Sequence, residues 1–304
     1  MKTMPQTSSQ KIEGVIPPMM TPFHENEEVD YKAFVRNIER WNKEPLAGYL
    51  VLGSNSEAAY LTEHEKIKLI KLTVEHTPKG RIVLAGTGLE STKETLRLTE
   101  KAGFLGVRGA LVLTPSYYHP QMTDSALIAH FTYLADHSAI PILIYNVPRF
   151  THVNISLDAV RTLSQHPNII GMKDSSGDVA QLELFLKNVS SHFQVIVGTA
   201  ASWYPALQMG VTAGIFAVAN FAGNKLAAIQ SDFKAGRTQQ AEECYRKLLP
   251  VNAAVTATYG VPGMKYAATL MGYEGGYVRR PLLPLSNVAQ QDVQTIFKKA
   301  ELLS

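Results

Sequence analysis

Eight short apolar runs, each rich in Val, Ile and Leu and each followed by an amphipathic stretch, constrain the fold of this chain more than any other feature. Runs of this length that end in small or turn-forming residues are typical of buried strands. Both alternating faces of the runs are apolar, which favours parallel strands covered on two sides. The runs lie at Gly14–Pro17, Gly48–Leu52, Arg81–Gly86, Gly109–Thr114, Ile140–Tyr145, Ile169–Lys173, Gln194–Gly198 and Gly214–Val218.

Helix signals separate these runs. Thr62-Glu63-His64-Glu65 has the pattern of a capping box, and Ser91-Thr92-Lys93-Glu94 repeats it. Ser156 and Asp178 stand where each can cap a further helix. Strand and helix therefore alternate along the chain. Eight such units predict an eight-stranded parallel β/α (TIM) barrel in preference to a doubly wound open sheet.

The 304 residues suit one barrel of about 250 residues with an appendage, because no change of composition divides the chain. The polar stretch at 1–13 predicts a disordered lead-in, and residues 14–224 predict the barrel. Residues 225–304 carry helical patterns without a strong strand, so we expect a C-terminal helical extension packed on the barrel.

Composition argues against several classes of protein. A formal charge of +3, with 29 Lys and Arg scattered along the chain, offers no basic block for nucleic acid. The single cysteine, Cys244, excludes an internal disulfide and a thiolate zinc site, and it indicates a reducing, cytoplasmic compartment. No run approaches the roughly 18 apolar residues of a membrane span. The histidines are dispersed without His-Glu-x-x-His spacing, so we expect no metal.

A lysine ends the sixth run, in the segment Ile169-Ile170-Gly171-Met172-Lys173-Asp174. Burial there favours a neutral amine that can attack a carbonyl carbon, although a rim lysine paired with a carboxylate is the ordinary structural alternative. The fifth run ends at matching height in Tyr145, whose phenol could relay protons to and from an imine. Barrel enzymes work at the carboxyl ends of their strands, so these two residues are candidates for catalysis.

Two loops add weaker signals. The turn Gly53-Ser54-Asn55-Ser56-Glu57 offers hydroxyl, amide and backbone N–H groups that can bind a carboxylate, but an ordinary loop with a helix cap would look alike. The fourth run leads into Thr114-Pro115-Ser116-Tyr117-Tyr118-His119-Pro120, an aromatic loop that would also suit surface packing.

Taken in this order, these residues resemble the dihydrodipicolinate synthase and N-acetylneuraminate lyase family of class I pyruvate aldolases, from about Gly14 to the C-terminal region. Two segments carry the resemblance: Tyr145-Asn146-Val147-Pro148 and Gly171-Met172-Lys173-Asp174. The resemblance implies that Lys173 forms a Schiff base with a 2-oxo acid and that Tyr145 relays protons. It implies no cofactor, and a homotetramer built as a dimer of dimers.

The same resemblance assigns further roles. Ser54 joins a hydroxyl relay with Tyr145 and with Tyr117, which a neighbouring subunit supplies. Ser54 and Asn55 hold the pyruvate carboxylate, and Glu57 matches the acidic residue after that turn. The positions lining the lysine are Gly198 and the backbone carbonyl of Phe216, with Ser175 just beyond Lys173.

Departures from the pattern bear on the substrate. The synthase branch has an arginine that binds the second substrate's carboxylate where this chain has Phe150, and Arg149 stands next to it. Three segments look closer to the 4-hydroxy-2-oxoglutarate aldolase branch: Gly53-Ser54-Asn55, Lys173-Asp174-Ser175 and Asn252-Ala253-Ala254-Val255-Thr256. That branch usually has glycine at Ser56, so we expect strain of about 1 kcal/mol if the position requires a positive φ.

Our leading hypothesis is reversible cleavage of a 4-hydroxy-2-oxo acid, such as 4-hydroxy-2-oxoglutarate or a 2-keto-3-deoxy sugar acid, to pyruvate and an aldehyde. Three alternatives stay open. One is a synthase or dehydratase that uses the same imine with another electrophile or leaving group, such as the condensation of pyruvate with aspartate semialdehyde. Another is a catalytically silent 2-oxo acid binding barrel, because a fold does not fix a function. The third is a phosphate-binding barrel enzyme that uses Gly86-Thr87-Gly88 and Gly275-Gly276 as loops.

Overall fold

The structure, a computed structural model, describes residues 11–303 and contains all eight predicted strands. The strand bounds differ from the predicted runs by no more than a few residues. The strands are β1 (Gly14–Ile16), β2 (Gly48–Val51), β3 (Ile82–Gly86), β4 (Gly109–Leu113), β5 (Ile142–Asn146), β6 (Ile169–Asp174), β7 (Gln194–Val197) and β8 (Ala213–Ile215).

The strands are all parallel and follow the order β1-β8-β7-β6-β5-β4-β3-β2. The two ends of this sheet meet through a parallel bridge between Pro18 and Leu50, where Met19 N–H donates to the Leu50 carbonyl at 2.8 Å. This contact closes the sheet into the predicted TIM barrel. The carboxyl ends of the strands consequently form one rim.

Side chains alternate between the inside and the outside of the barrel, as the pleat of a strand requires. Along β5, Leu143 and Tyr145 belong to a compact cluster with Ile16, Leu50 and other strand residues, which fills the interior. The intervening strand residues join the larger core between the strands and the helices. The runs read as apolar on both faces because the barrel covers both.

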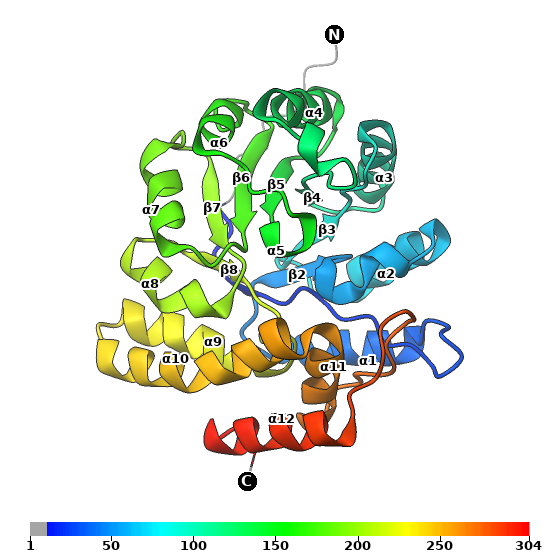
Figure 1. Cartoon of the computed structure of the whole chain (residues 1–304), viewed down its shortest axis with the longest axis vertical. Coiled ribbons are helices and arrows are strands. Elements are labelled where there is room, and N and C mark those ends of the chain that lie inside the picture. The colour runs from blue at the N-terminus through cyan, green and yellow to red at the C-terminus, as the bar shows by residue number, and fades with distance from the viewer. Residues whose placement is uncertain (1–10, 304) are drawn as a thin grey trace.

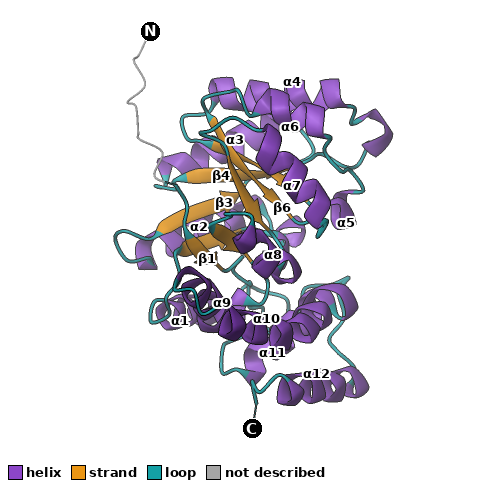
Figure 2. Ribbon diagram, turned by 90° about the vertical axis from the view of Figure 1, so that its left-hand side faces the viewer, coloured by secondary structure: helices purple, strands orange, loops and turns teal. Residues whose placement is uncertain are grey.

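Twelve α-helices surround or extend the barrel within residues 11–303 (Figures 1 and 2). They are α1 (Tyr31–Trp41), α2 (Glu63–His76), α3 (Thr92–Phe104), α4 (Asp124–His137), α5 (Pro148–Thr151), α6 (Leu157–Leu163), α7 (Val179–Asn188), α8 (Trp203–Gln208), α9 (Ala219–Lys234), α10 (Thr238–Ala253), α11 (Gly260–Leu270) and α12 (Asn287–Lys299).

The predicted helix starts are confirmed. Thr62 caps α2 in a complete capping box with Glu65. Ser91, Ser156 and Asp178 accept backbone N–H groups at the starts of α3, α6 and α7. Capping satisfies N–H groups that the first turn of a helix leaves without partners, so these residues fix where each helix begins.

A C-terminal helical extension follows the barrel, as predicted. Helix α9 packs on β1 and spans the expected boundary at residue 225, and α10, α11 and α12 then gather beside α9 and α1 (Figure 1). A π-helix, Ala254–Thr258, joins α10 to α11. None of the helices described is both long and apolar enough to cross a membrane. Of the expected lead-in, residues 1–10 lie outside the described part, and the Ile12 N–H donates to Gln194 Oε1 at 2.9 Å.

Candidate active site

Lys173 and Tyr145 lie side by side at the carboxyl ends of β6 and β5. Lys173 pairs in register with Tyr145 on one side and with Ile196 on the other, and both partners belong to the interior cluster, so Lys173 also faces the barrel interior. Lys173 is 3% exposed and Tyr145 is 6% exposed. The Lys173 Nζ lies 4.2 Å from the centroid of the Tyr145 ring. The structure therefore brings together the two residues on which the sequence argument depends.

The phenol of Tyr145 lies in an environment that favours its ionised form. Burial alone would raise its pKa, but the charge of Lys173 and the polar groups of Ser54, Ser175 and Lys173 around the phenol outweigh burial, and the pKa falls below its usual value. The Ser54 Oγ lies 3.5 Å from the Tyr145 Oη. A phenol with a lowered pKa is a better proton acceptor near neutral pH, which suits general acid–base work.

Asp174 follows Lys173 but faces the outer side of the strand. Its carboxylate accepts hydrogen bonds from Asn146 Nδ2 at 2.7 Å and from Ser176 Oγ at 2.6 Å. Burial raises the pKa of Asp174 even though these donors oppose the shift. Asn146 also accepts the Ile155 N–H, at 3.1 Å. This arrangement ties the ends of β5 and β6 together and so holds Tyr145 and Lys173 at a fixed separation.

The wall beside Lys173 requires a glycine. A Cβ at Gly198 would lie 2.9 Å from Lys173 Cε and 1.8 Å from Ser175 Oγ, so a larger residue would displace both side chains. The Gly198 N–H donates to the Asp174 carbonyl at 2.6 Å. The buried Ser175 Oγ has no acceptor in good hydrogen-bond geometry within the described residues. Ser175 is therefore placed to contact a ligand bound at Lys173.

The turn after β2 is a short 3₁₀ segment, Ser54–Ser56, and each of its side chains is tethered. Ser54 approaches Tyr145, and Asn55 Nδ2 lies 3.2 Å from Met264 Sδ on α11. The Ser56 hydroxyl donates to the Met19 carbonyl. The strain expected of a serine at a positive φ does not arise at Ser56, because the left-handed conformation falls on the next residue, Glu57, with φ of 55°.

The other predicted residues differ widely in exposure. Tyr117 is 77% exposed, and its ring packs edge-on against Tyr118. Phe150 on α5 is 57% exposed. The neighbouring Arg149 donates to the Ala257 carbonyl of the π-helix at 2.8 Å. Phe216 is fully buried and packs against Trp203, with its carbonyl accepting the Ala219 N–H.

Sequence reasoning missed a second buried lysine near the turn. Lys265 on α11 is 2% exposed, and its Nζ lies 2.5 Å from Glu57 Oε1. Burial lowers the pKa of Lys265 to about 8, although the charge of Glu57 opposes that shift. The available signal was of the same kind as for Lys173, because Lys265 is a lone charge in the largely apolar segment Gly260–Leu270.

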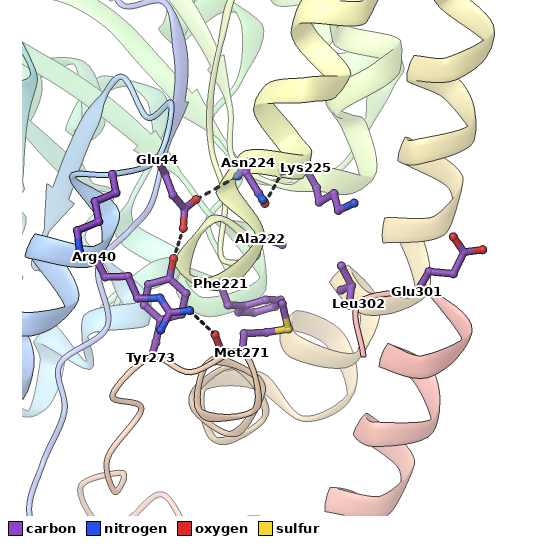
Figure 3. A pocket seen from close by; sticks show the side chains of 11 residues that line it. Arg40, Glu44, Phe221, Ala222, Asn224, Lys225, Met271, Tyr273, Glu301 and Leu302 are labelled. Carbon is purple, nitrogen blue, oxygen red and sulfur yellow. Dashed lines mark hydrogen bonds between the residues drawn. The ribbon is translucent and has the colours of Figure 1, made fainter. Parts of the chain in front are cut away.

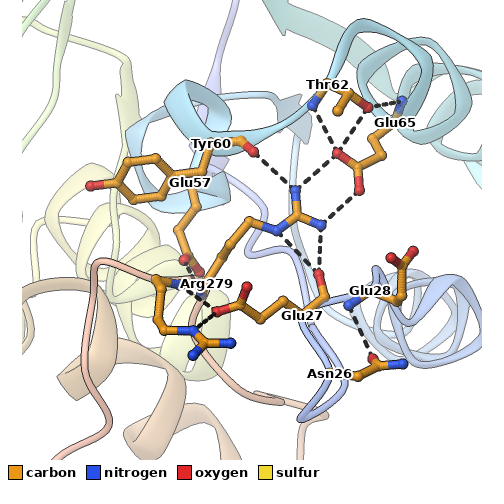
Figure 4. Close-up of polar contacts among 9 residues, drawn as sticks. Asn26, Glu27, Glu28, Glu57, Tyr60, Thr62, Glu65 and Arg279 are labelled. Carbon is orange, nitrogen blue, oxygen red and sulfur yellow. Dashed lines mark hydrogen bonds and ion pairs between the residues drawn. The ribbon is translucent and has the colours of Figure 1, made fainter.

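Arg279 was also missed, since the chain after α11 shows no periodic pattern. Its backbone N–H donates to Glu57 Oε2 at 2.9 Å, and its guanidinium binds Glu65 and the Glu27 carbonyl (Figure 4). Sequence reasoning also assigned no role to Asn252 itself, only to the segment that contains it. Its Nδ2 donates to Thr199 Oγ1 at 3.3 Å, beside Gly198. These contacts join segments that are 50 to more than 200 residues apart in sequence.

The glycine pairs proposed as phosphate loops have packing functions. A Cβ at Gly86 would lie 2.1 Å from the Leu52 carbonyl oxygen, and one at Gly275 would lie 2.2 Å from that of Lys265. Close approach of backbone segments therefore accounts for both glycines. Among residues 11–303, no cluster of three or more His, Cys, Asp or Glu is arranged to hold a metal ion.

A cavity of about 360 Å³ is lined by other residues, between α1, α9 and the chain that follows α11 (Figure 3). Glu44 in its wall accepts the Tyr273 hydroxyl and the Asn224 N–H. Glu44 thus ties the C-terminal extension to the barrel at a second place, through residues other than those that contact the Ser54–Ser56 turn.

Comparisons with known proteins agree with this geometry. The model of the Dihydrodipicolinate synthetase family matches residues 11–300. A 4-hydroxy-tetrahydrodipicolinate synthase of Methanoculleus marisnigri is 35% identical, over 93% of this chain and 98% of the relative. The synthase of Methanococcoides burtonii is 34% identical, over 90% of this chain and 93% of the relative.

Solved structures show the same likeness. The 4-hydroxy-tetrahydrodipicolinate synthase of Methylacidiphilum fumariolicum superimposes with a TM-score of 0.90 at 29% identity, covering 96% of this chain and 97% of that one. A dihydrodipicolinate synthase from Acinetobacter baumannii, solved with pyruvate, gives 0.91 at 28% identity, covering 96% and 100%. The chain therefore belongs to the Dihydrodipicolinate synthetase family, and with it to the Schiff-base-forming, pyruvate-dependent lyases and synthases.

Proposed function

We propose that this protein reversibly cleaves a 4-hydroxy-2-oxo acid to pyruvate and an aldehyde, with Lys173 as the Schiff-base residue. The observation that carries the proposal is the buried contact of Lys173 with Tyr145, with Ser54 next to the phenol. A primary amine held out of water beside a proton acceptor is the arrangement that imine chemistry needs. No cofactor takes part in the proposed mechanism.

The proposed reaction proceeds through an imine and an enamine. The neutral Lys173 Nζ attacks the 2-oxo carbon, and loss of water from the carbinolamine gives a protonated imine. Tyr145 accepts the proton of the 4-hydroxyl group, the C3–C4 bond breaks, and its electron pair passes to the iminium nitrogen as an aldehyde leaves. The resulting enamine takes a proton at C3, and water then releases pyruvate and restores the amine.

The substrate carboxylate is assigned to the Ser54–Asn55 turn. Hydroxyl, amide and backbone N–H groups at this turn can bind an anion without a formal positive charge. Ser175 and Gly198 line the other side of Lys173, where the buried Ser175 hydroxyl is available to a substrate oxygen. The role assigned to Phe216 is confined to its backbone carbonyl, because its side chain packs on Trp203 in the core between the strands and the helices.

Two observations favour different second substrates. The synthase arginine is replaced by the exposed Phe150, and Arg149 is bound to the Ala257 carbonyl, which supports the aldolase. The curated relatives are named 4-hydroxy-tetrahydrodipicolinate synthases, which supports condensation of pyruvate with aspartate semialdehyde as the second candidate. Product analysis separates the two, since only the synthase consumes aspartate semialdehyde and only the aldolase releases glyoxylate or a sugar-derived aldehyde.

Borohydride reduction in the presence of pyruvate tests the shared chemistry. We expect a stable adduct on the peptide that contains Lys173, and no adduct in Lys173→Ala. Failure of the wild-type protein to acquire the label would refute the Schiff-base proposal. Tight pyruvate binding without exchange of its methyl hydrogens into deuterated water would instead support a silent 2-oxo acid binder.

The oligomer is a further part of the proposal. We infer a cytoplasmic homotetramer in which Tyr117 of one subunit reaches the Tyr145 of its neighbour, an arrangement that fits the high exposure of Tyr117 in the single chain. Gel filtration tests the assembly. A Tyr117→Phe variant with wild-type turnover would remove Tyr117 from the relay.

A further inference from the structure

The C-terminal helical extension contacts the Ser54–Ser56 turn at two successive residues of α11. Met264 Sδ lies 3.2 Å from Asn55 Nδ2, and Lys265 Nζ lies 2.5 Å from Glu57 Oε1. Two neighbouring residues of α11 thus hold Asn55, which lies inside the Ser54–Ser56 turn, and Glu57, which directly follows that turn. The α11 helix does not merely cover the barrel but abuts the part of it that we assign to substrate binding.

The Glu57–Lys265 pair is enclosed on all sides. Glu57 is 3% exposed, and its second oxygen accepts the Arg279 N–H at 2.9 Å. The Lys265 ammonium also donates to the Tyr277 carbonyl and lies 4.5 Å from the centroid of the Phe23 ring. Buried charges are costly to remove from water and are stable only when each has its partner, so neither side chain can move without the other.

The backbone at Glu57 makes this pair relevant to the turn. Glu57 adopts a left-handed conformation, with φ of 55° and ψ of 36°, directly after Ser56. A residue other than glycine is held in this region only when its surroundings compensate for the strain. The two partners that grip the Glu57 carboxylate, Lys265 and the Arg279 N–H, supply that compensation.

Arg279 also links Glu57 to the start of α2. Its guanidinium forms a paired contact with the Glu65 carboxylate, at 2.7 and 2.9 Å, and it also binds the Glu27 and Tyr60 carbonyls (Figure 4). The short connection between the turn and α2 is therefore fastened at both ends to the segment that follows α11. This leaves the turn little freedom to shift relative to Lys173.

We propose that Glu57 and Lys265 are positioning residues for the substrate carboxylate, so that the C-terminal helical extension helps to set the geometry of the active site. This inference rests on the proposed function, because it takes the Ser54–Asn55 turn as the carboxylate site. Neither residue touches the substrate. They act by fixing the turn at the distance from Lys173 at which a bound 2-oxo acid presents its carbonyl carbon to the amine.

The test compares Glu57→Gln, Lys265→Met and the double variant. Each single change leaves an unpaired group in the interior, so we expect a lower melting temperature and a KM for the 2-oxo acid raised by about 10-fold to 100-fold. The double variant leaves no unpaired charge and should regain most of the stability while its KM stays above that of the wild-type protein. A double variant with a wild-type KM would overturn the proposal.

Glu44→Gln is the matched control. It makes the same substitution in another carboxylate that ties the C-terminal extension to the barrel, but through Tyr273 at the cavity and with no hydrogen bond to the Ser54–Ser56 turn among the described residues (Figure 3). We expect this variant to lose stability without a change in KM. A rise in KM as large as that of Glu57→Gln would mean that general loosening, and not the turn, sets substrate binding.

A second measurement separates this proposal from the proposed function. Non-covalent binding of pyruvate to Lys173→Ala, followed by saturation-transfer NMR, should weaken when Glu57→Gln is added. Weakening in a protein whose wild-type form takes no borohydride label would leave the positioning role standing and the Schiff-base chemistry refuted. Unchanged binding, in a protein whose wild-type form is labelled, would refute the positioning role and leave the Schiff-base chemistry standing.

Discussion

Two lysines of this protein are buried, one on a barrel strand and the other in the C-terminal helical extension. Lys173 on β6 is 3% exposed and Lys265 on α11 is 2% exposed. Lys265 forms an ion pair with Glu57, whereas Lys173 lies over the ring of Tyr145. Within residues 11–303, the ion pairs formed by lysine side chains do not include Lys173.

The difference shows that burial alone does not identify a reactive lysine. The Glu57 carboxylate opposes the effect of burial on Lys265, whose pKa of about 8 still leaves the ammonium, which is not nucleophilic, as the main form at neutral pH. A phenol partner can instead exchange a proton with the amine and later with the substrate. The partner, and not the degree of burial, therefore separates the proposed nucleophile from the proposed positioning residue.

Replacing each lysine by methionine should have the largest effects of the variants that test this comparison. Lys173→Met should reduce turnover by at least about 1,000-fold and abolish the borohydride label, because the nucleophile is gone. Its melting temperature should stay at or above that of the wild-type protein. Lys265→Met should still acquire the label, more slowly, but should lose about 3–5 kcal/mol of unfolding free energy because Glu57 remains buried without its partner.

The measurements are mass spectrometry after reduction and urea unfolding of both variants. Label on Lys173→Met would place the reactive amine elsewhere in the chain. An unchanged unfolding free energy for Lys265→Met would show that the buried pair contributes little, and the comparison between the two lysines would fail.

Tyr145→Phe tests the other member of the reactive pair and should have the next largest effect. Phenylalanine keeps the ring that Lys173 contacts but removes the hydroxyl near Ser54. We expect kcat to fall by about 100-fold to 10,000-fold, since general acid–base catalysis contributes about that much. Borohydride trapping should persist at a reduced rate. Near wild-type turnover in this variant would assign the proton relay to another group.

The same contrast explains what could be predicted from the sequence. Lys173 and Tyr145 end two neighbouring strands, and register follows from the alternation of a parallel sheet, so their proximity was predictable. The eight strands and the caps at Thr62 and Asp178 were also predictable, because each depends on a local pattern in the sequence.

The Glu57–Lys265 pair depends on the packing of α11 against a turn about 200 residues earlier, and no local pattern reports such a contact. Ser56 also shows that the residue type at one position does not predict the backbone conformation there. The expected strain falls on Glu57 because the backbone around the turn, and not the type of residue at one position, decides where the left-handed conformation occurs. Aperiodic segments such as the one that holds Arg279 are recognised as structural only after the fold is known.

Acid should weaken the contacts that surround the Glu57–Lys265 pair, because Arg279, whose N–H binds Glu57, forms an ion pair with Glu65. Hydrogen bonds from Arg279 lower the pKa of Glu65 to about 2 against the opposing effect of burial, while the ordinary value is 4.5. The unfolded chain therefore takes up a proton at higher pH than the native protein does. The stabilisation by Glu65 is complete above about pH 4.5 and is lost as the pH falls towards 2, by about 2 kcal/mol after allowance for its partial exposure.

Urea unfolding at several pH values measures this loss, and Glu65→Gln should flatten the dependence on pH between about 4.5 and 2. Glu63→Gln is the matched control, because Arg97 and Lys101 also lower the pKa of Glu63 to about 2 but this carboxylate is exposed to solvent. Solvent screens an exposed pair, so the control should change the slope less than Glu65→Gln does. Equal changes in the two variants would mean that the segment after α11 is no more dependent on charge than the protein surface.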